Sequence, residues 1–145
     1  VNENLTHFLT ITVIEWIDIF TKAEYFQAII NSLKYCQKNK GLLIYEFVIM
    51  PNHVHALIAF RNTGQSINMI VGNGKRFIAY EIIKRLKKQK EEKLLHQLYL
   101  SVEAKDRERN KKHEVWEDSF DWKECRTNEY MLALRRKLFY SMYYT

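Results

Sequence analysis

Short apolar runs rich in β-branched and aromatic residues mark three strands in the first half of the chain. They cover residues 7–20, 42–50 and 54–60, and are bounded by polar or turn-forming residues. Pro51 and Asn52 form a tight-turn signal between the last two runs. We therefore expect those two strands to pair as an antiparallel hairpin.

Apolar residues at intervals of three or four predict helices between and after these strands. The first helix follows Thr21, which we expect to cap it in a capping box with Glu24, and it stops near Gly41. A longer helix begins at Ser66. Its predicted buried face consists of Ile67, Val71, Gly74, Ile78, Ile82 and Leu86.

The second half of the chain contains a further helical piece at 91–106, a charged loop at 107–113 and a short aromatic segment at 114–122 that could hold a fourth strand. A last helix follows Thr127, a suitable cap. This order predicts an α+β fold of the ferredoxin or RRM type, with helices on one face of an antiparallel sheet. We expect residues 1–145 to form a single domain.

Composition and charge limit the classes of function that the chain can have. The net charge of +6 and the pI of about 9.3 favour an anionic partner such as nucleic acid, or a lysine-rich soluble surface. Cys36 and Cys125 stand apart, so a thiolate metal cluster is not expected. No apolar run is long enough for a membrane span, and we expect a cytoplasmic protein.

The run "IMPNHVHALIAF" places His53 and His55 two residues apart in a strand. Side chains at i and i+2 of a strand project from the same face, about 7 Å apart. Two neutral imidazoles so placed can share a divalent cation, although further ligands are needed to complete its coordination. The alternative is that one histidine packs at a strand edge and the other faces solvent.

The sequence "VIMPNHVHALI" resembles the HUH motif (His, hydrophobic, His) of the single-tyrosine transposases, which include insertion-sequence and REP-associated tyrosine transposases. The segments "TVIEWIDIF", "NMIVGNGKRFIAYEIIKRL" and "VWEDSFDWKECRTNEYMLALRRKLFY" also resemble such proteins, in the same order. The resemblance implies a ferredoxin-like single-stranded DNA endonuclease and strand transferase. It further implies that His53 and His55 hold Mg²⁺ or Mn²⁺ on the scissile phosphate.

The same resemblance implies that a tyrosine on the C-terminal helix attacks the phosphate and forms a 5′-phosphotyrosine. In "KLFYSMYYT", Tyr140 falls at the nucleophile's position, with Tyr130 as the second candidate. The family has Asn or Gln four residues after the nucleophile as a metal ligand, where this chain has Tyr144, and the family's Asn-Pro is absent. This end is expected to be truncated, frameshifted or diverged.

The segment 75–93 carries eight Lys or Arg and three Glu residues. It is either a solvated helix face or a surface that follows DNA phosphates. The predicted DNA contacts are Lys75, Arg76, Lys84 and Arg85. Three aromatic side chains could stack on bases or lie in the core, namely Trp116, Phe120 and Trp122.

Two alternatives to an active transposase stay open. The altered C-terminal segment favours a catalytically impaired nucleic-acid-binding relative. A hydrolase of small phosphoesters that uses the two histidines would need carboxylate ligands that the sequence does not place. For the transposase we expect single-stranded or hairpin DNA as the substrate, no membrane, association with the nucleoid, and a homodimer.

Overall fold

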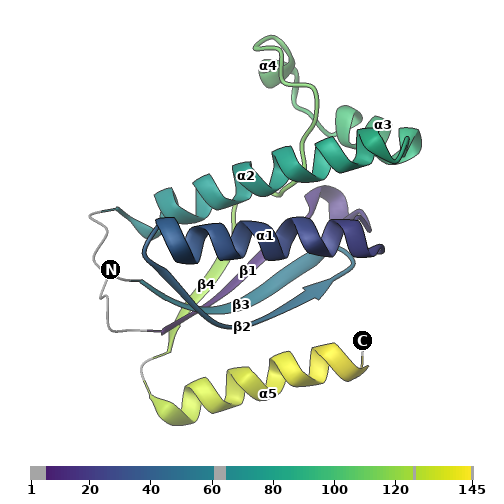
Figure 1. Ribbon diagram of the computed structural model, residues 1–145. Coiled ribbons are helices and arrows are strands. Elements are labelled where there is room, and N and C mark those ends of the chain that lie inside the picture. Colours follow the sequence, from purple (N-terminus) through teal and green to yellow (C-terminus); the bar gives the residue numbers. More distant parts are fainter. Residues whose placement is uncertain (1–5, 61–64, 126, 145) are drawn as a thin grey trace.

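A four-stranded antiparallel sheet forms the centre of the protein (Figure 1). The computed structural model describes residues 6–60, 65–125 and 127–144, without the side chains of Phe60 and of residues 138–144. The strands, in the order β2-β3-β1-β4 across the sheet, are β2 (Leu42–Met50), β3 (His53–Phe60), β1 (Thr6–Thr12) and β4 (Asp121–Cys125). This order confirms the predicted α+β, ferredoxin-like fold.

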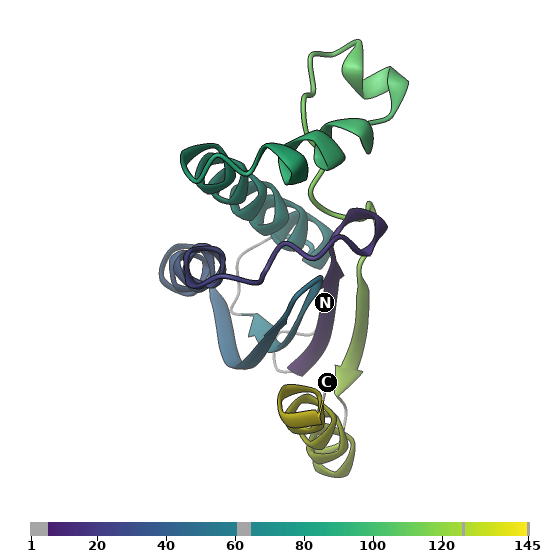
Figure 2. The same ribbon diagram turned by 90° about the vertical axis from the view of Figure 1, so that its right-hand side faces the viewer.

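Helices cover both faces of this sheet (Figures 1 and 2). On one face lie α1 (Ala23–Asn39) and α2 (Ile67–Lys88), as predicted, while α5 (Asn128–Tyr144) lies against the opposite face. Two shorter helices, α3 (Glu92–Leu100) and α4 (Ala104–Arg107), follow α2 and project beyond the sheet.

The main core lies between the sheet and the helices α1 and α2. Its centre includes Ile29, Ile58 and Ile82, whose side chains are almost completely buried. The predicted apolar face of α2 is confirmed, because all of its members are buried except the half-buried Gly74. A smaller cluster on the opposite face consists of Phe8, Val48, Leu57, Cys125 and Leu134.

The first strand is shorter than the predicted segment 7–20, because β1 ends at Thr12. A single 3-10 turn, η1 (Ile14–Trp16), follows, and Glu15 and Trp16 adopt positive φ angles of 54° and 56° that no strand allows. The rest of the apolar run covers the core as a loop that buries Ile19 and Phe20, whose N–H groups donate to the carbonyl of Pro51. Their apolar character reflects burial and not strand pairing.

Of the two predicted helix caps, the one at Thr127 is confirmed, and the helix predicted to begin at Ser66 is capped by that residue. Ser66 accepts a hydrogen bond from the N–H of Met69, and Thr127 accepts one from the N–H of Tyr130. The capping box at Thr21 is wrong, because α1 begins at Ala23 after Lys22, which makes no side-chain capping bond.

The fourth strand lies later than the predicted segment 114–122. Trp116 is only 4% exposed and forms an isolated bridge with Val13, while regular pairing begins at Asp121. The indole of Trp116 donates to the carbonyl of Lys75 at 2.9 Å and packs against Phe20. These contacts bury Trp116 in a loop that precedes the strand. Among the residues described here, no helix is long and apolar enough to cross a membrane.

A matched pair of leucines on α3 tests the position of the core. Leu98 is fully buried and Leu100 is 59% exposed. Leu98→Ala should lower the free energy of unfolding by about 2–5 kcal/mol, because it leaves a cavity. Leu100→Ala should change it by less than about 0.5 kcal/mol. Urea unfolding measures both, and equal losses would contradict this packing.

Candidate active site

The alternation of side chains along β3 places the two histidines on the face that α5 covers. Val54, Ala56 and Ile58 belong to the core beneath α1 and α2. Leu57 belongs to the cluster that includes Leu134 of α5. Because successive strand residues point to opposite faces, His53 and His55 share the face of Leu57.

The two imidazoles lie side by side, and each also contacts an aromatic ring. Their ring centroids are 4.7 Å apart and their planes are inclined by 77°. The ring of Phe8 stacks on His55 with centroids 5.4 Å apart, and the indole of Trp16 meets His53 edge-on at 6.0 Å. The predicted proximity of the histidines is thus present in the structure.

A hydrogen-bonding partner at Nδ1 orients the ring of each histidine. Nδ1 of His53 lies 2.7 Å from Oδ1 of Asn52, and Nδ2 of Asn52 donates to the carbonyl of Trp16 at 3.4 Å. Since Oδ1 can only accept, Nδ1 of His53 carries the proton and its Nε2 presents a lone pair. Nδ1 of His55 lies 2.8 Å from the hydroxyl of Thr10, which can donate or accept.

Both histidines are kept neutral at neutral pH. Burial lowers the pKa of His55 to about 4, with additional lowering by the positive charges of His53 and Lys137. Burial also lowers the pKa of His53. Neutral imidazoles with hydrogen-bonded Nδ1 atoms are the form that binds a metal ion, so these two residues fit a divalent cation.

The described part of the chain does not complete a metal-binding set. No group of three or more His, Cys, Asp or Glu side chains in that part is placed to hold a metal. Glu46 lies on the same face of β2 as Val48, the partner of His55. Its carboxylate forms an ion pair with Arg135 of α5 at 2.6 Å. Tyr144 lies outside the described side chains.

The helix α5 extends from the end of the sheet near Cys125 toward the end with the β2–β3 turn, where the histidines lie (Figure 1). Lys137 of this helix is close enough for its charge to lower the pKa of His55. Tyr140 belongs to the next turn of α5, and its side chain lies outside the described part of the chain. Tyr130, the second candidate, is 37% exposed in the first turn.

A basic groove lies between α2 and the segment 109–118, with a cavity volume of about 850 Å³. Three carboxylates and the exposed Tyr80 also line it. Its cationic side chains are Lys75, Arg76, Lys84, Lys87, Arg109, Lys111 and Lys112. Three of the four predicted DNA contacts, Lys75, Arg76 and Lys84, therefore line one groove.

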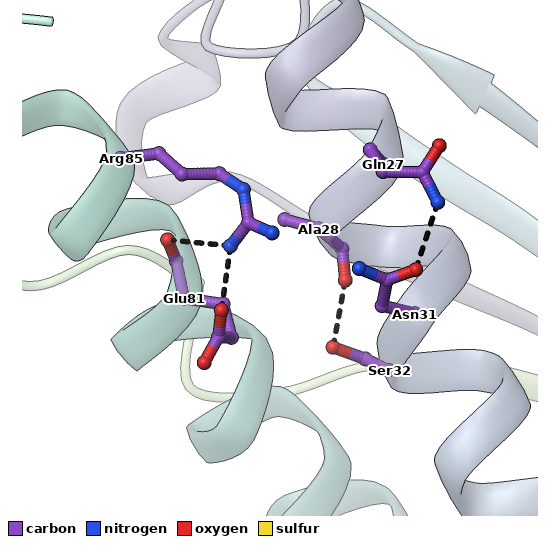
Figure 3. A network of polar contacts seen from close by, with 6 residues as sticks. All are labelled: Gln27, Ala28, Asn31, Ser32, Glu81 and Arg85. Carbon is purple, nitrogen blue, oxygen red and sulfur yellow. Dashed lines mark hydrogen bonds and ion pairs between the residues drawn. The ribbon is translucent and has the colours of Figure 1, made fainter. Parts of the chain in front are cut away.

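Two of the predicted DNA contacts also have partners within the protein. The ammonium of Lys75 donates to the carbonyls of Glu117, Asp118 and Ser119, at 2.6, 3.4 and 3.5 Å. Burial lowers the pKa of Lys75, against the opposing effect of nearby carboxylates. Arg85 forms an ion pair with Glu81 at 2.6 Å and points from α2 toward α1 (Figure 3). Arg76 and Lys84 are exposed.

The family model described as "Transposase IS200 like" matches residues 4–111, which include both histidines and α2. The chain belongs to the IS200-like transposase family. This confirms the family predicted from the motif and from the ordered segments around it. No curated protein sequence matches the chain.

Solved transposase structures share the fold of this IS200-like chain. A REP-associated tyrosine transposase bound to a REP hairpin superposes with a TM-score of 0.56 and is 13% identical, over 95% of this chain. A candidate transposase from Deinococcus radiodurans R1 superposes with a TM-score of 0.60 at 14% identity, over 95% of this chain and 90% of its own length. This chain spans only 64% of the length of the REP-bound protein.

Three residues around the histidines are recognised only in the structure. Asn52 was interpreted as a turn former and Trp16 as part of a strand, whereas both contact His53. Thr10 contacts His55 across 45 residues of sequence. The only signal in the sequence is that Asn52 adjoins the first histidine, and the other two contacts depend on strand register.

The ionisation of His55 tests this environment. In the metal-free protein its ring should stay neutral until the pH approaches 4, and it should be the last of the two histidines to gain a proton. Since the unfolded chain protonates histidine near pH 6.5, this group should reduce folding stability as the pH falls from about 6.5 toward 4.

Two-dimensional ¹⁵N–¹H NMR of the imidazole rings measures this titration. His53→Ala removes one source of positive charge and should raise the pKa of His55. A pKa near 6.5 for His55 in the wild-type protein would contradict the buried site described here.

Proposed function

We propose that the protein is a transposase that cleaves and rejoins single-stranded DNA through a covalent tyrosine intermediate. The observation that carries this proposal is the placement of two neutral histidines on the face covered by α5, next to the turn of helix that precedes Tyr140. A pair of metal-ligating groups and a tyrosine on a facing helix are the parts that such phosphoryl transfer needs.

The histidines would bind the divalent cation through Nε2, and the hydrogen bonds of Asn52 and Thr10 would hold the rings in place. When bound, Mg²⁺ or Mn²⁺ would polarise a non-bridging oxygen of the scissile phosphate. Water and phosphate oxygens would supply the remaining ligands. Because imidazole is a better ligand for Mn²⁺ than for Mg²⁺, Mn²⁺ should act at the lower concentration.

Tyr140 would act as the nucleophile. Its phenolic oxygen would form a bond to phosphorus while the bond from phosphorus to the 3′ oxygen breaks. The proton of the phenol would pass to solvent, and the departing 3′ oxygen would take a proton from solvent. The products would be a 5′-phosphotyrosine and a free 3′-hydroxyl, and attack by a 3′-hydroxyl would reverse the step and join strands. The positive charge of Lys137, close to His55, would attract the phosphate.

The basic groove would hold DNA outside the cleavage site. Arg76 and Lys84 line the groove and are exposed, so they are suitable phosphate contacts. Lys75 would contribute mainly by holding the segment 117–119 in place through its three carbonyl contacts. Arg85, paired with Glu81, would contribute less than the two exposed residues. The REP hairpin bound by the similar transposase makes hairpin DNA a reasonable substrate.

A catalytically impaired DNA-binding relative is the second candidate. It is favoured by the absence, among the described residues, of a third side chain placed to complete the metal site. Such a protein would bind DNA through the same groove but would form no covalent adduct at any Mn²⁺ concentration. A homodimer, a cytoplasmic location and association with the nucleoid belong to the transposase proposal as further expectations.

Tyrosine variants test the nucleophile. With hairpin DNA flanked by single strands and Mn²⁺, Tyr140→Phe should reduce the covalent protein–DNA adduct on a denaturing gel by more than about 1,000-fold. Tyr130→Phe, on the same helix, is the matched control and should keep the adduct. His53→Ala and His55→Ala should remove the adduct while DNA binding persists. An adduct that survives Tyr140→Phe rules out the assignment.

Charge variants test the groove. Arg76→Ala and Lys84→Ala should each weaken DNA binding and reduce the slope of log Kd against log salt by about one. Lys38→Ala removes an exposed cation from the last turn of α1, outside the groove, and is the control. Fluorescence anisotropy at several salt concentrations measures the slopes. Equal slopes for all three variants would show that DNA does not follow this groove.

A further inference from the structure

The turn that follows β1 holds an uncommon backbone conformation beside the histidines. Glu15 and Trp16, with φ angles of 54° and 56°, are consecutive left-handed residues, and neither is glycine. This conformation is costly for side chains with a Cβ, and it is retained only where surrounding contacts impose it. Strain of this kind at the edge of a candidate site suggests a function for the side chain that it presents.

Hydrogen bonds on both sides of the turn impose this conformation. The N–H of Glu15 donates to the carboxylate of Glu117 at 2.8 Å, and the N–H of Trp16 donates to the carbonyl of Val13 at 3.0 Å. The amide of Asn52 donates to the carbonyl of Trp16 at 3.4 Å. The turn is thus held by Val13, by the β2–β3 turn and by the segment before β4.

This backbone conformation leaves the indole of Trp16 exposed at the edge of the candidate site. Trp16 is 63% exposed, whereas Trp116 is 4% exposed in the core. The exposed ring lies edge-on to His53, at a centroid distance of 6.0 Å. A large apolar ring that packing does not bury, beside the residues that would hold a phosphate, is available to a ligand with a flat apolar surface.

The turn also lies between the basic groove and the histidines. Glu117, which lines the groove, accepts from Glu15 and donates its own N–H to the carbonyl of Thr12. Thr12 is the partner of His53 across the β1–β3 pair. Figure 2 shows the turn beside the segment that descends from α4 to β4. A single strand of nucleic acid that runs from the groove to the histidines would therefore pass Trp16.

We infer that Trp16 is a stacking platform for a base of single-stranded nucleic acid next to the phosphate held at His53 and His55. Aromatic side chains bind single strands in this way because every base has a flat face. The site would accept any base, and it would hold the neighbouring phosphate in register with the histidines. Asn52, which bonds to both Trp16 and His53, would keep the two parts of the site in a constant relation. This inference rests on the proposed function.

Two probes with the same number of phosphates distinguish binding by base stacking from binding by charge. The first is oligo(dT) of about 20 nucleotides, and the second is an abasic strand of the same length. Dissociation constants are measured with Mn²⁺ in a Tyr140→Phe background, which prevents cleavage. The protein with Trp16 should bind oligo(dT) more tightly than the abasic strand.

Trp16→Ala should weaken binding to oligo(dT) by about 5- to 150-fold and leave binding to the abasic strand unchanged. Trp16→Gly should do the same, and the left-handed conformation suits glycine, so this variant also covers the case in which Trp16→Ala folds poorly. Trp16→Phe should retain most of the affinity. Trp122→Ala is the control, because Trp122 is 40% exposed and lies beside His7, on the sheet face opposite the histidines.

Equal losses on both probes, or no loss on either, would overturn the inference. Failure of the parent protein to distinguish oligo(dT) from the abasic strand would overturn it as well. Adduct formation by the protein with an intact Tyr140 is scored separately. An adduct without base-dependent binding contradicts the stacking platform alone, whereas base-dependent binding without an adduct contradicts the proposed cleavage alone.

Discussion

The face on which β3 presents each side chain is the constraint on which the rest of the site depends. β3 lies between β2 and β1, so its backbone pairs on both sides. Val54, Ala56 and Ile58 fill the main core, and this burial determines the register. A shift by one residue would bury the histidines and expose these apolar side chains. Burial of the apolar side chains on one face of β3 therefore places His53 and His55 on the face that α5 covers.

On the opposite face, the described side chains make fewer contacts with the sheet. Leu134 packs into the small cluster around Leu57, and Arg135 forms an ion pair with Glu46 near the edge of the sheet. Because Arg135 is about half exposed, this pair contributes little stability on its own and serves mainly to align the helix. These contacts hold the described part of α5 against the sheet. The candidate catalytic parts thus combine a pair of histidines held on the sheet with a tyrosine on the helix that faces them.

The features that periodicity encodes were predictable from the sequence. The buried face of α2, the hairpin that contains Pro51 and the shared face of the histidines follow from spacings of two or of three to four residues. Trp16 was predicted as strand, because a local pattern does not distinguish an apolar residue in a strand from one in a strained turn held by distant partners. β4 was placed too early for a similar reason, since Trp116 is apolar to fill the core and not to pair. Arg85 stays a predicted DNA contact, and its ion pair with Glu81, one helical turn earlier, is a feature that the sequence analysis did not anticipate.

Peptide mapping of the covalent protein–DNA complex tests the central claim most directly, namely that α5 supplies the nucleophile to the histidine pair. After nuclease and trypsin digestion, mass spectrometry should find the nucleotide remnant on the peptide that begins at Leu138, and fragmentation should place it on Tyr140. Metal-free protein should give no such peptide. A remnant on a tyrosine outside α5, or on Tyr140 with both histidines replaced by alanine, would contradict the account.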